Sequence, residues 1–108
     1  MRVAVDGVHD DDFARDLHSR DVEQVEAGAD VVMLGVEDRD GLAGIARAWS
    51  RAATGGALWI VYPRGVRTVT ENDVRSAGLA AGVVDVKVVR FSATHTALRF
   101  VARKPARR

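Results

Sequence analysis

The sequence predicts a single α/β domain of three layers, in which a mainly parallel sheet lies between helices. Two runs, Asp30–Val36 and Leu58–Tyr62, are apolar at nearly every position and are bounded by glycine, proline or charged residues. Strands that are buried on both faces of a parallel sheet have this pattern. Helical patterns flank Leu58–Tyr62, and two strand-like segments joined by a short turn follow them. Alternating strands and helices favour right-handed crossovers, and the terminal hairpin adds one antiparallel strand.

The first predicted elements are a strand at Arg2–Asp6 and a helix at Asp10–Ser19. Three aspartates stand at the start of this helix, where the positive end of the helix dipole stabilises negative charge. Phe13 and Leu17 are four residues apart, so we expect them to form the buried stripe of the helix. Asp21–Glu26 is a weaker strand candidate, because its valines fit neither the helical nor the strand period.

The middle of the chain predicts a helix, Asp38–Ala53, that leads into the central strand. Its apolar residues recur at spacings of three and four: Leu42, Ile45, Ala46, Trp49 and Ala52. Gly55 and Gly56 follow, and we expect these two glycines to end the helix.

The last part of the chain predicts a helix and a hairpin. Thr70 and Asp73 have the T-x-x-D spacing of a capping box, which places the start of a helix that runs to Gly82. Val84–Phe91 and His95–Arg103 are the two strands of the hairpin. We expect residues 1–103 to form one domain and residues 104–108 to form a flexible basic tail.

Four stretches resemble the C-terminal half of S-adenosylmethionine-dependent methyltransferases of the Rossmann-like class: ADVVMLGV, GGALWIVYP, GLAAGVVDVKVV and ALRFVARK. The whole chain is similar to a family of short uncharacterised bacterial proteins that look like reduced methyltransferase domains. Asp30–Val36, Gly56–Gly65 and Gly78–Phe100 carry this similarity. That family has no assigned activity, so the resemblance implies a fold and not a function. A tryptophan often stands in the family where His95 stands here, so this chain lacks any role that the tryptophan has.

The resemblance also implies the order of the strands in the sheet. Numbered along the chain, the strands should lie in the order 2-1-3-4-6-5, with His95–Arg103 antiparallel to its neighbours. Three core strands of the parent class would then be reduced to a small remnant on one side of the sheet.

Composition excludes several classes of function. The chain has 108 residues and no cysteine, which rules out disulfides, thiol catalysis and cysteine-ligated metals. No apolar run approaches the ~20 residues of a membrane span, and the first residues do not form a signal peptide, so we expect a cytoplasmic protein and no membrane partner. Net charge is +1, but acidic residues dominate the first half of the chain and basic residues the second. Such asymmetry marks either a nucleic-acid face or pairing between the halves.

The loop after the first strand is the expected place for the methyltransferase cofactor, because backbone must approach the ligand there. The sequence VAVDGVHDDD starts like such a loop with its Asp-Gly pair, but the next three residues do not continue the motif, and Glu26 is only a loose match for a second acid. We therefore predict no cofactor and no bound S-adenosylmethionine. The candidate residues of this crevice are Asp6, Gly7, Glu37 and Asp38.

Seven carboxylates fall in the loops that should meet where the strand order reverses, which is where open α/β sheets bind ligands: Asp6, Asp10, Asp11, Asp12, Glu37, Asp38 and Asp40. Carboxylate oxygens could hold Mg²⁺ there. The same residues are also what solvated helix starts contain. We favour solvated helix starts, keep Mg²⁺ as the alternative and assign no metal ligand.

A candidate anion site is formed by Arg64 and Arg67 together with Thr70 at the start of a helix. In the alternative reading both arginines are exposed loop charges and Thr70 only caps the helix, and the sequence favours this reading.

The three histidines, His9, His18 and His95, lie in separate segments without metal-binding spacing. Ser92, Thr94 and Thr96 flank His95, but no acid that could orient its imidazole stands nearby in the sequence. A nucleophile needs a base and an orienting group in reach, so no catalytic residue is assigned.

The terminal hairpin carries four cations and two aromatic residues that could form a nucleic-acid platform: Lys87, Arg90, Arg99, Arg103, Phe91 and Phe100. Strand alternation, however, turns Phe100 toward the core with Leu98. The isoelectric point of about 8.3 also lies below the value of ~9 that is typical of dedicated binders. The sequence therefore argues against nucleic acid as the partner.

The sequence favours a non-catalytic binding or interaction module that associates with itself or with an unidentified protein partner. A small methyltransferase-related enzyme that uses the crevice after the first strand is the alternative. Nucleic-acid binding through the basic hairpin is the second alternative.

Overall fold

The computed structural model describes residues 1–103, which form one six-stranded sheet with the strand order β2-β1-β3-β4-β6-β5. This is the order that the resemblance to methyltransferases implies, and the predicted α/β fold class is confirmed. The elements are β1 Arg2–Asp6, α1 Asp11–Ser19, β2 Glu23–Gln24, β3 Ala29–Gly35, the 3₁₀ helix η1 Arg39–Gly44, α2 Ile45–Trp49, β4 Ala52–Pro63, α3 Glu71–Ala80, β5 Val83–Arg90 and β6 His95–Ala102. The predicted basic tail, 104–108, lies outside the described residues.

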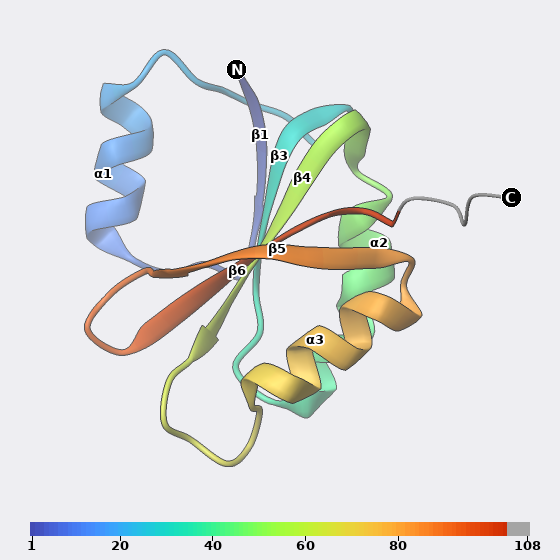
Figure 1. The fold of residues 1–108 in the computed structure, drawn as a ribbon. Helices are drawn as coiled ribbons and strands as arrows, with labels where there is room; N and C mark the ends of the chain where they lie inside the picture. The colour runs from blue at the N-terminus through green and yellow to red at the C-terminus, as the bar shows by residue number, and fades with distance from the viewer. Residues whose placement is uncertain (104–108) are drawn as a thin grey trace, which may run out of the picture.

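The sheet is parallel from β2 to β4, and β6 is antiparallel to both of its neighbours. Figure 1 shows α1 on one side of the twisted sheet and α2 and α3 on the other. The weak strand candidate is paired: β2 joins β1 through Arg2 opposite Glu23 and Val3 opposite Gln24, at the edge of the sheet. No helix in residues 1–103 has both the length and the apolar character needed to cross a membrane.

The two faces of the sheet are buried to different extents. The face under α2 and α3 holds the main core, whose largest fully buried side chains include Phe100, Ile45, Leu58, Ile60 and Leu98. The face toward α1 holds a smaller cluster, Val3, Met33, Val61 and Ala97. No residue of α1 is fully buried, and Phe13 and Leu17 are only half-buried. The predicted stripe therefore exists but is not fully buried, because this helix packs over a small cluster at its edge.

The predicted helix Asp38–Ala53 is wrong in its extent. The segment forms η1 and the five-residue helix α2, and β4 starts at Ala52, which pairs with Ala29. Gly55 and Gly56 therefore lie inside the strand and end no helix. Gly55 has φ of +81°, and the register between β3 and β4 shifts beside it, so the glycines accommodate an irregularity in the strand.

The predicted capping box of α3 is confirmed. The Thr70 hydroxyl accepts from the N–H of Asp73 at 3.2 Å, and the Asp73 carboxylate accepts from the N–H of Thr70 at 3.0 Å. Thr70 has extended backbone, as an N-cap residue should. The helix is thus fixed at its start by its own sequence.

Candidate functional site

A pocket of about 170 Å³ opens at the carboxyl ends of β1, β3 and β4. β1 and β3 are the neighbours between which the strand order reverses, so this is where an open α/β sheet binds ligands. The turn between β5 and β6 closes the other side. The lining residues are Gly7, Val8, His9, Asp10, Gly35, Glu37, Val61, Phe91, Ser92, Thr94 and His95.

A chain of hydrogen bonds runs through the rim of this pocket from Glu37 to Thr94. His95 Nε2 lies 2.8 Å from a carboxylate oxygen of Glu37, and His95 Nδ1 lies 2.7 Å from the Thr94 hydroxyl. An ionised carboxylate can only accept, so Nε2 carries the proton toward Glu37. In the neutral imidazole Nδ1 then accepts from Thr94.

The structure therefore supplies the orienting acid that the sequence does not show beside His95. Glu37 precedes His95 by 58 residues and reaches it because the ends of β3 and β6 face the same pocket. The arrangement can hold a proton-accepting nitrogen in a fixed orientation, which is one requirement for acid–base chemistry. No signal local to His95 in the sequence could have identified Glu37.

Arg64 fixes the turn that carries this histidine. Its guanidinium donates to the carbonyl oxygens of Ser92, Ala93 and His95 and to the Thr96 hydroxyl. Through these hydrogen bonds the guanidinium links the end of β4 to the β5–β6 turn.

The predicted anion site is not assembled as one cluster. Arg64 is directed to the β5–β6 turn, whereas the Thr70 side chain is engaged in the capping box of α3. Arg67 is exposed in the loop between them. Thr70 caps the helix, as in the alternative in which both arginines are exposed loop charges, but Arg64 bonds the β5–β6 turn.

The four crevice candidates separate into two groups. Gly7 and Glu37 line the pocket. Asp6 lies on the opposite face of β1, beside Arg51, whose guanidinium approaches its carboxylate to 3.9 Å. Asp38 caps η1 by accepting from the N–H of Gly41 at 3.2 Å. Two of the four candidate residues, Gly7 and Glu37, therefore line the pocket, and Asp6 and Asp38 do not.

The loop after β1 lies directly on the end of β3. A Cβ atom built on Gly35 would stand 2.1 Å from the carbonyl oxygen of Gly7, so the two backbones are in contact. Gly7 has φ of +71°, which a glycine adopts without strain. Backbone therefore fills the place between the ends of β1 and β3, and the pocket is displaced toward β4 and the β5–β6 turn.

Within residues 1–103, no group of three or more histidine, aspartate or glutamate side chains is placed to hold a metal ion. Several of the seven acidic residues of the predicted switch-point loops have other partners instead. Asp10 caps α1 by accepting from the N–H of Phe13 at 2.8 Å, and Asp38 caps η1. The Mg²⁺ alternative therefore has no preformed ligand set in this part of the chain.

A second polar cluster, on the other face of β4, begins at Tyr62. Its hydroxyl donates to Glu71 at 3.2 Å, and Arg75 bridges Glu71 at 2.8 Å and Asp85 at 2.9 Å. Burial, followed by the negative charge of Glu71, raises the pKa of Tyr62 to about 12. This network ties α3 to β4 and β5 and lies outside the pocket.

No protein-family model and no curated protein matches this chain. Solved methyltransferase structures do. The ribosomal protein L11 methylase of Lactobacillus delbrueckii subsp. bulgaricus matches with a TM-score of 0.63 and 10% identity, over 95% of this chain and 70% of that one. An O-methyltransferase of neocarzinostatin biosynthesis, in complex with S-adenosylmethionine, matches with a TM-score of 0.65 and 14% identity, over 94% and 49%.

A third match is the 1,6-didemethyltoxoflavin-N1-methyltransferase of Burkholderia thailandensis, with a TM-score of 0.60 and 14% identity, over 94% of this chain and 61% of that one. At these identities the likeness shows the fold alone. The chain has the methyltransferase-like Rossmann fold, and it spans between 49% and 70% of these larger proteins.

Proposed function

We propose that this chain is a cytoplasmic binding module on a methyltransferase-like fold, and that its pocket takes a small polar ligand without transferring a methyl group to it. The observation that carries the proposal is the pocket at the ends of β1, β3 and β4, with the oriented Glu37–His95–Thr94 chain on its rim. A site at the strand-order reversal with convergent polar groups is the default binding site of an α/β sheet.

The lining of the pocket indicates the chemistry of its ligand. Val8, Val61 and Phe91 supply apolar wall, and Glu37 supplies a carboxylate that is 65% exposed. The exposed carboxylate oxygens accept hydrogen bonds, so a ligand with an amine, amide or hydroxyl donor suits them. The volume of about 170 Å³ lies below the ~300 Å³ at which drug-sized ligand sites begin. The ligand is therefore small.

Three features argue against S-adenosylmethionine as that ligand. The backbones of Gly7 and Gly35 are in contact where a cofactor would need space between β1 and β3. Asp6 is on the other face of the sheet. β2 is only two residues long and pairs with the start of β1, so it places no side chain at the carboxyl edge.

The proposal is tested by native mass spectrometry of the purified chain, followed by a fragment screen read as shifts in backbone amide resonances. We expect fragments with a donor group to shift Gly7, Gly35 and His95 together. H95A and E37Q should each weaken binding about tenfold, because each removes a hydrogen bond to a charged or oriented group. H18A, on the exposed face of α1, is the matched control. Fragments that bind H95A as tightly as the unaltered chain would contradict the assigned site.

A methyltransferase-related enzyme is the second candidate, because the fold matches and because a base is oriented in the crevice. A ligand group that displaced the Thr94 hydroxyl would meet Nδ1 of His95, with Glu37 holding the opposite nitrogen. Calorimetric titration with S-adenosylmethionine decides between the candidates. Micromolar binding that D6N abolishes would replace our proposal with the enzyme.

We also propose that the module associates with a second copy of itself. β5 is the outer strand of the sheet, and it exposes Val86 and Val88 to 52% and 49%. An open edge with apolar residues is a template for pairing with another strand. A dimer in native mass spectra that V88K dissociates would support pairing of two copies at this edge, and a monomer at all concentrations would remove this part of the proposal.

A further inference from the structure

The face of the sheet toward α1 carries an open row of one tryptophan and two cations that lies away from the pocket. Trp59 on β4 stands opposite Arg99 on β6, and Arg99 stands opposite Lys87 on β5. Directly opposed residues of antiparallel strands point to the same face. Trp59 packs at the margin of the Val3–Met33–Val61–Ala97 cluster, which places the row on the α1 face.

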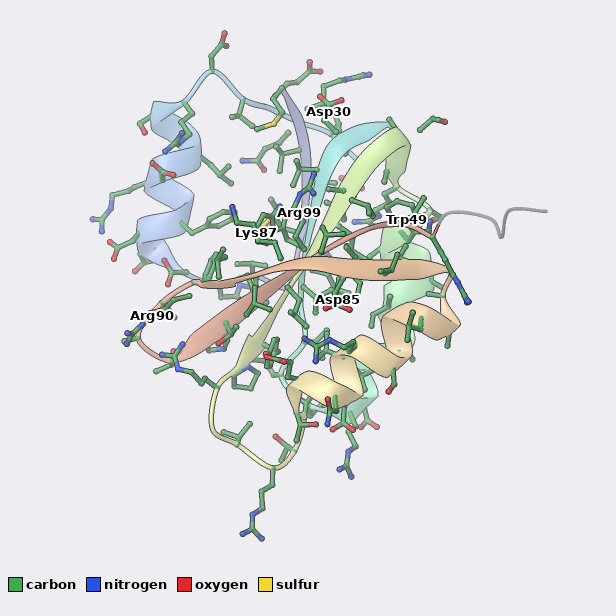
Figure 2. All side chains as sticks on the ribbon, in the orientation of Figure 1. Asp30, Trp49, Asp85, Lys87, Arg90 and Arg99 are labelled. Atoms are coloured by element: carbon green, nitrogen blue, oxygen red, sulfur yellow. The ribbon has the colours of Figure 1, made fainter. Side chains whose placement is uncertain are left out.

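This row is accessible. Trp59 and Arg99 are half-buried, and Lys87 is exposed. Figure 2 shows Lys87 and Arg99 on the side of the sheet where α1 lies, whereas Asp85 lies on the α3 side and Arg90 lies near the end of the hairpin. Apolar side chains continue the surface, since Val84 stands opposite Val101 in the adjacent position of the same strands.

The two cations of the row have no acidic partner among residues 1–103. The acidic residues of the second half, Glu71, Asp73 and Asp85, are paired with Arg75 and Arg39. On the same face, Asp12 and Asp16 of α1 pair with Arg15 and Arg20. The charge of Lys87 and Arg99 is therefore available to a ligand from outside.

We propose that Trp59, Arg99 and Lys87 form a binding platform for single-stranded nucleic acid. An aromatic face next to cations is the combination that binds such strands, because a base stacks on the ring while phosphates meet the cations. The sequence disfavours this partner on two grounds: Phe100 turns toward the core, and the isoelectric point of about 8.3 lies below the value of ~9 that is typical of dedicated binders. Phe100 is indeed fully buried, but Trp59 takes the place of the aromatic residue in the platform. A duplex, whose bases are already stacked, should bind less well.

The test is fluorescence anisotropy with a labelled single-stranded oligonucleotide, titrated at several salt concentrations, with the same sequence as a duplex for comparison. K87Q/R99Q should weaken binding of the single strand about tenfold or more at low salt, and should reduce the slope of log K against log salt by about 1.4. R90Q/R103Q removes the same charge from the same hairpin and is the matched control. Equal weakening by both double variants would overturn the platform, as would tighter binding of the duplex.

A second readout uses tryptophan fluorescence. The chain has two tryptophans, so W49F leaves Trp59 as the single reporter. We expect saturation with the oligonucleotide to quench this fluorescence, because a base stacks on the indole. An unchanged spectrum at saturation would contradict the proposal, and so would a native dimer that buries Trp59 and excludes the oligonucleotide.

Discussion

His95 illustrates how little the neighbourhood of a residue in the sequence says about its site. Its flanking hydroxyl residues are visible in the sequence, and Thr94 does bond to it at 2.7 Å. Its acidic partner Glu37 follows β3, and Arg64, which holds its turn, follows β4. The imidazole is thus oriented by three segments, and the site exists only when all three are folded together.

The environment of a second single residue, Tyr62, can be tested by spectroscopy. It is the only tyrosine, and its pKa is raised from ~10 to about 12 by burial and by Glu71. We expect ultraviolet titration to show phenolate formation only near pH 12 in the folded chain and near ~10 in the denatured chain. E71Q should lower the folded value part of the way, because burial remains. A folded midpoint near ~10 would show that the hydroxyl is solvated.

The same shift makes stability depend on pH. The folded state binds the phenolic proton more tightly than the unfolded state, so this contribution is present in full below pH ~10 and is lost as the pH rises to about 12. The full difference between the two pKa values corresponds to at most about 3 kcal/mol of unfolding free energy. Urea melts at pH 9 and 11 should show about half of this loss, because pH 11 lies about one unit below the folded pKa, and Y62F is the control that should remove most of the pH dependence.

At the scale of elements, α3 is specified locally and η1–α2 is not. α3 has a capping box at Thr70 and Asp73 and a close contact between Gly78 and the ring of Phe100. The η1–α2 segment has a capped start at Asp38, but its end is decided by the pairing of Ala52 with Ala29. A helix that is capped by its own residues can be located from the sequence, whereas one that competes with a strand cannot.

The capping box predicts a defined loss of stability. T70A removes the acceptor for the Asp73 N–H and should lower the free energy of unfolding by about 1 kcal/mol. T68A, at an exposed position of the same loop, is the matched control and should change it by less than ~0.5 kcal/mol. Urea denaturation of the three proteins measures the effect. Equal midpoints for T70A and the unaltered chain would show that the cap contributes nothing.

Gly78 predicts a larger loss for a steric reason. A Cβ atom at this position would stand 2.4 Å from Cε2 of the buried Phe100 ring. G78A should therefore destabilise the chain by about 1–3 kcal/mol, although alanine is the better helix former. At Gly44 an added Cβ meets nothing within 4 Å, so G44A should be neutral or stabilising. Thermal melts of both variants test this prediction. A G78A variant that melts at a higher temperature than the unaltered chain would show that the Phe100 ring can move away from the added Cβ atom.

At the scale of the whole molecule, the unequal faces of the sheet divide the tasks. The main core fills the α2–α3 face and fixes the fold. The α1 face has a small core cluster, a helix with no fully buried residue, and the open row of Trp59, Arg99 and Lys87. The α1 face contributes less to the core, so its side chains are available for binding. The pocket lies at the edge of the sheet between the α1 face and the α2–α3 face.

This asymmetry predicts the pattern of hydrogen exchange. Amides of β4 and β6 should be the best protected, because each strand is paired on both sides and contributes to the main core. Amides of α1 should exchange faster than those of α3, because α1 buries no residue fully and α3 buries Val74 and Gly78. Native-state exchange followed by mass spectrometry measures this. Equal protection of α1 and α3 would show that the helices unfold as one unit.

Local patterns in the sequence predicted the fold class and the capped start of α3, whereas the strand order was implied by the resemblance to methyltransferases. The apolar run of Leu58–Tyr62, the run of Asp30–Val36 and the T-x-x-D motif are local patterns, and local patterns are set by burial and backbone geometry that neighbours in the chain provide. That Gly55 and Gly56 lie inside β4 could be learned only from the folded chain, because the partner strand and not the local propensity fixes where a strand begins.

The sites were also decided by the tertiary structure. Glu37 meets His95 across 58 residues, and Trp59, Arg99 and Lys87 meet across three strands. Register between strands sets these contacts, and register depends on every pairing in the sheet at once. A pattern within one strand shows which face a side chain occupies, whereas its neighbours on that face are known only when the sheet is assembled.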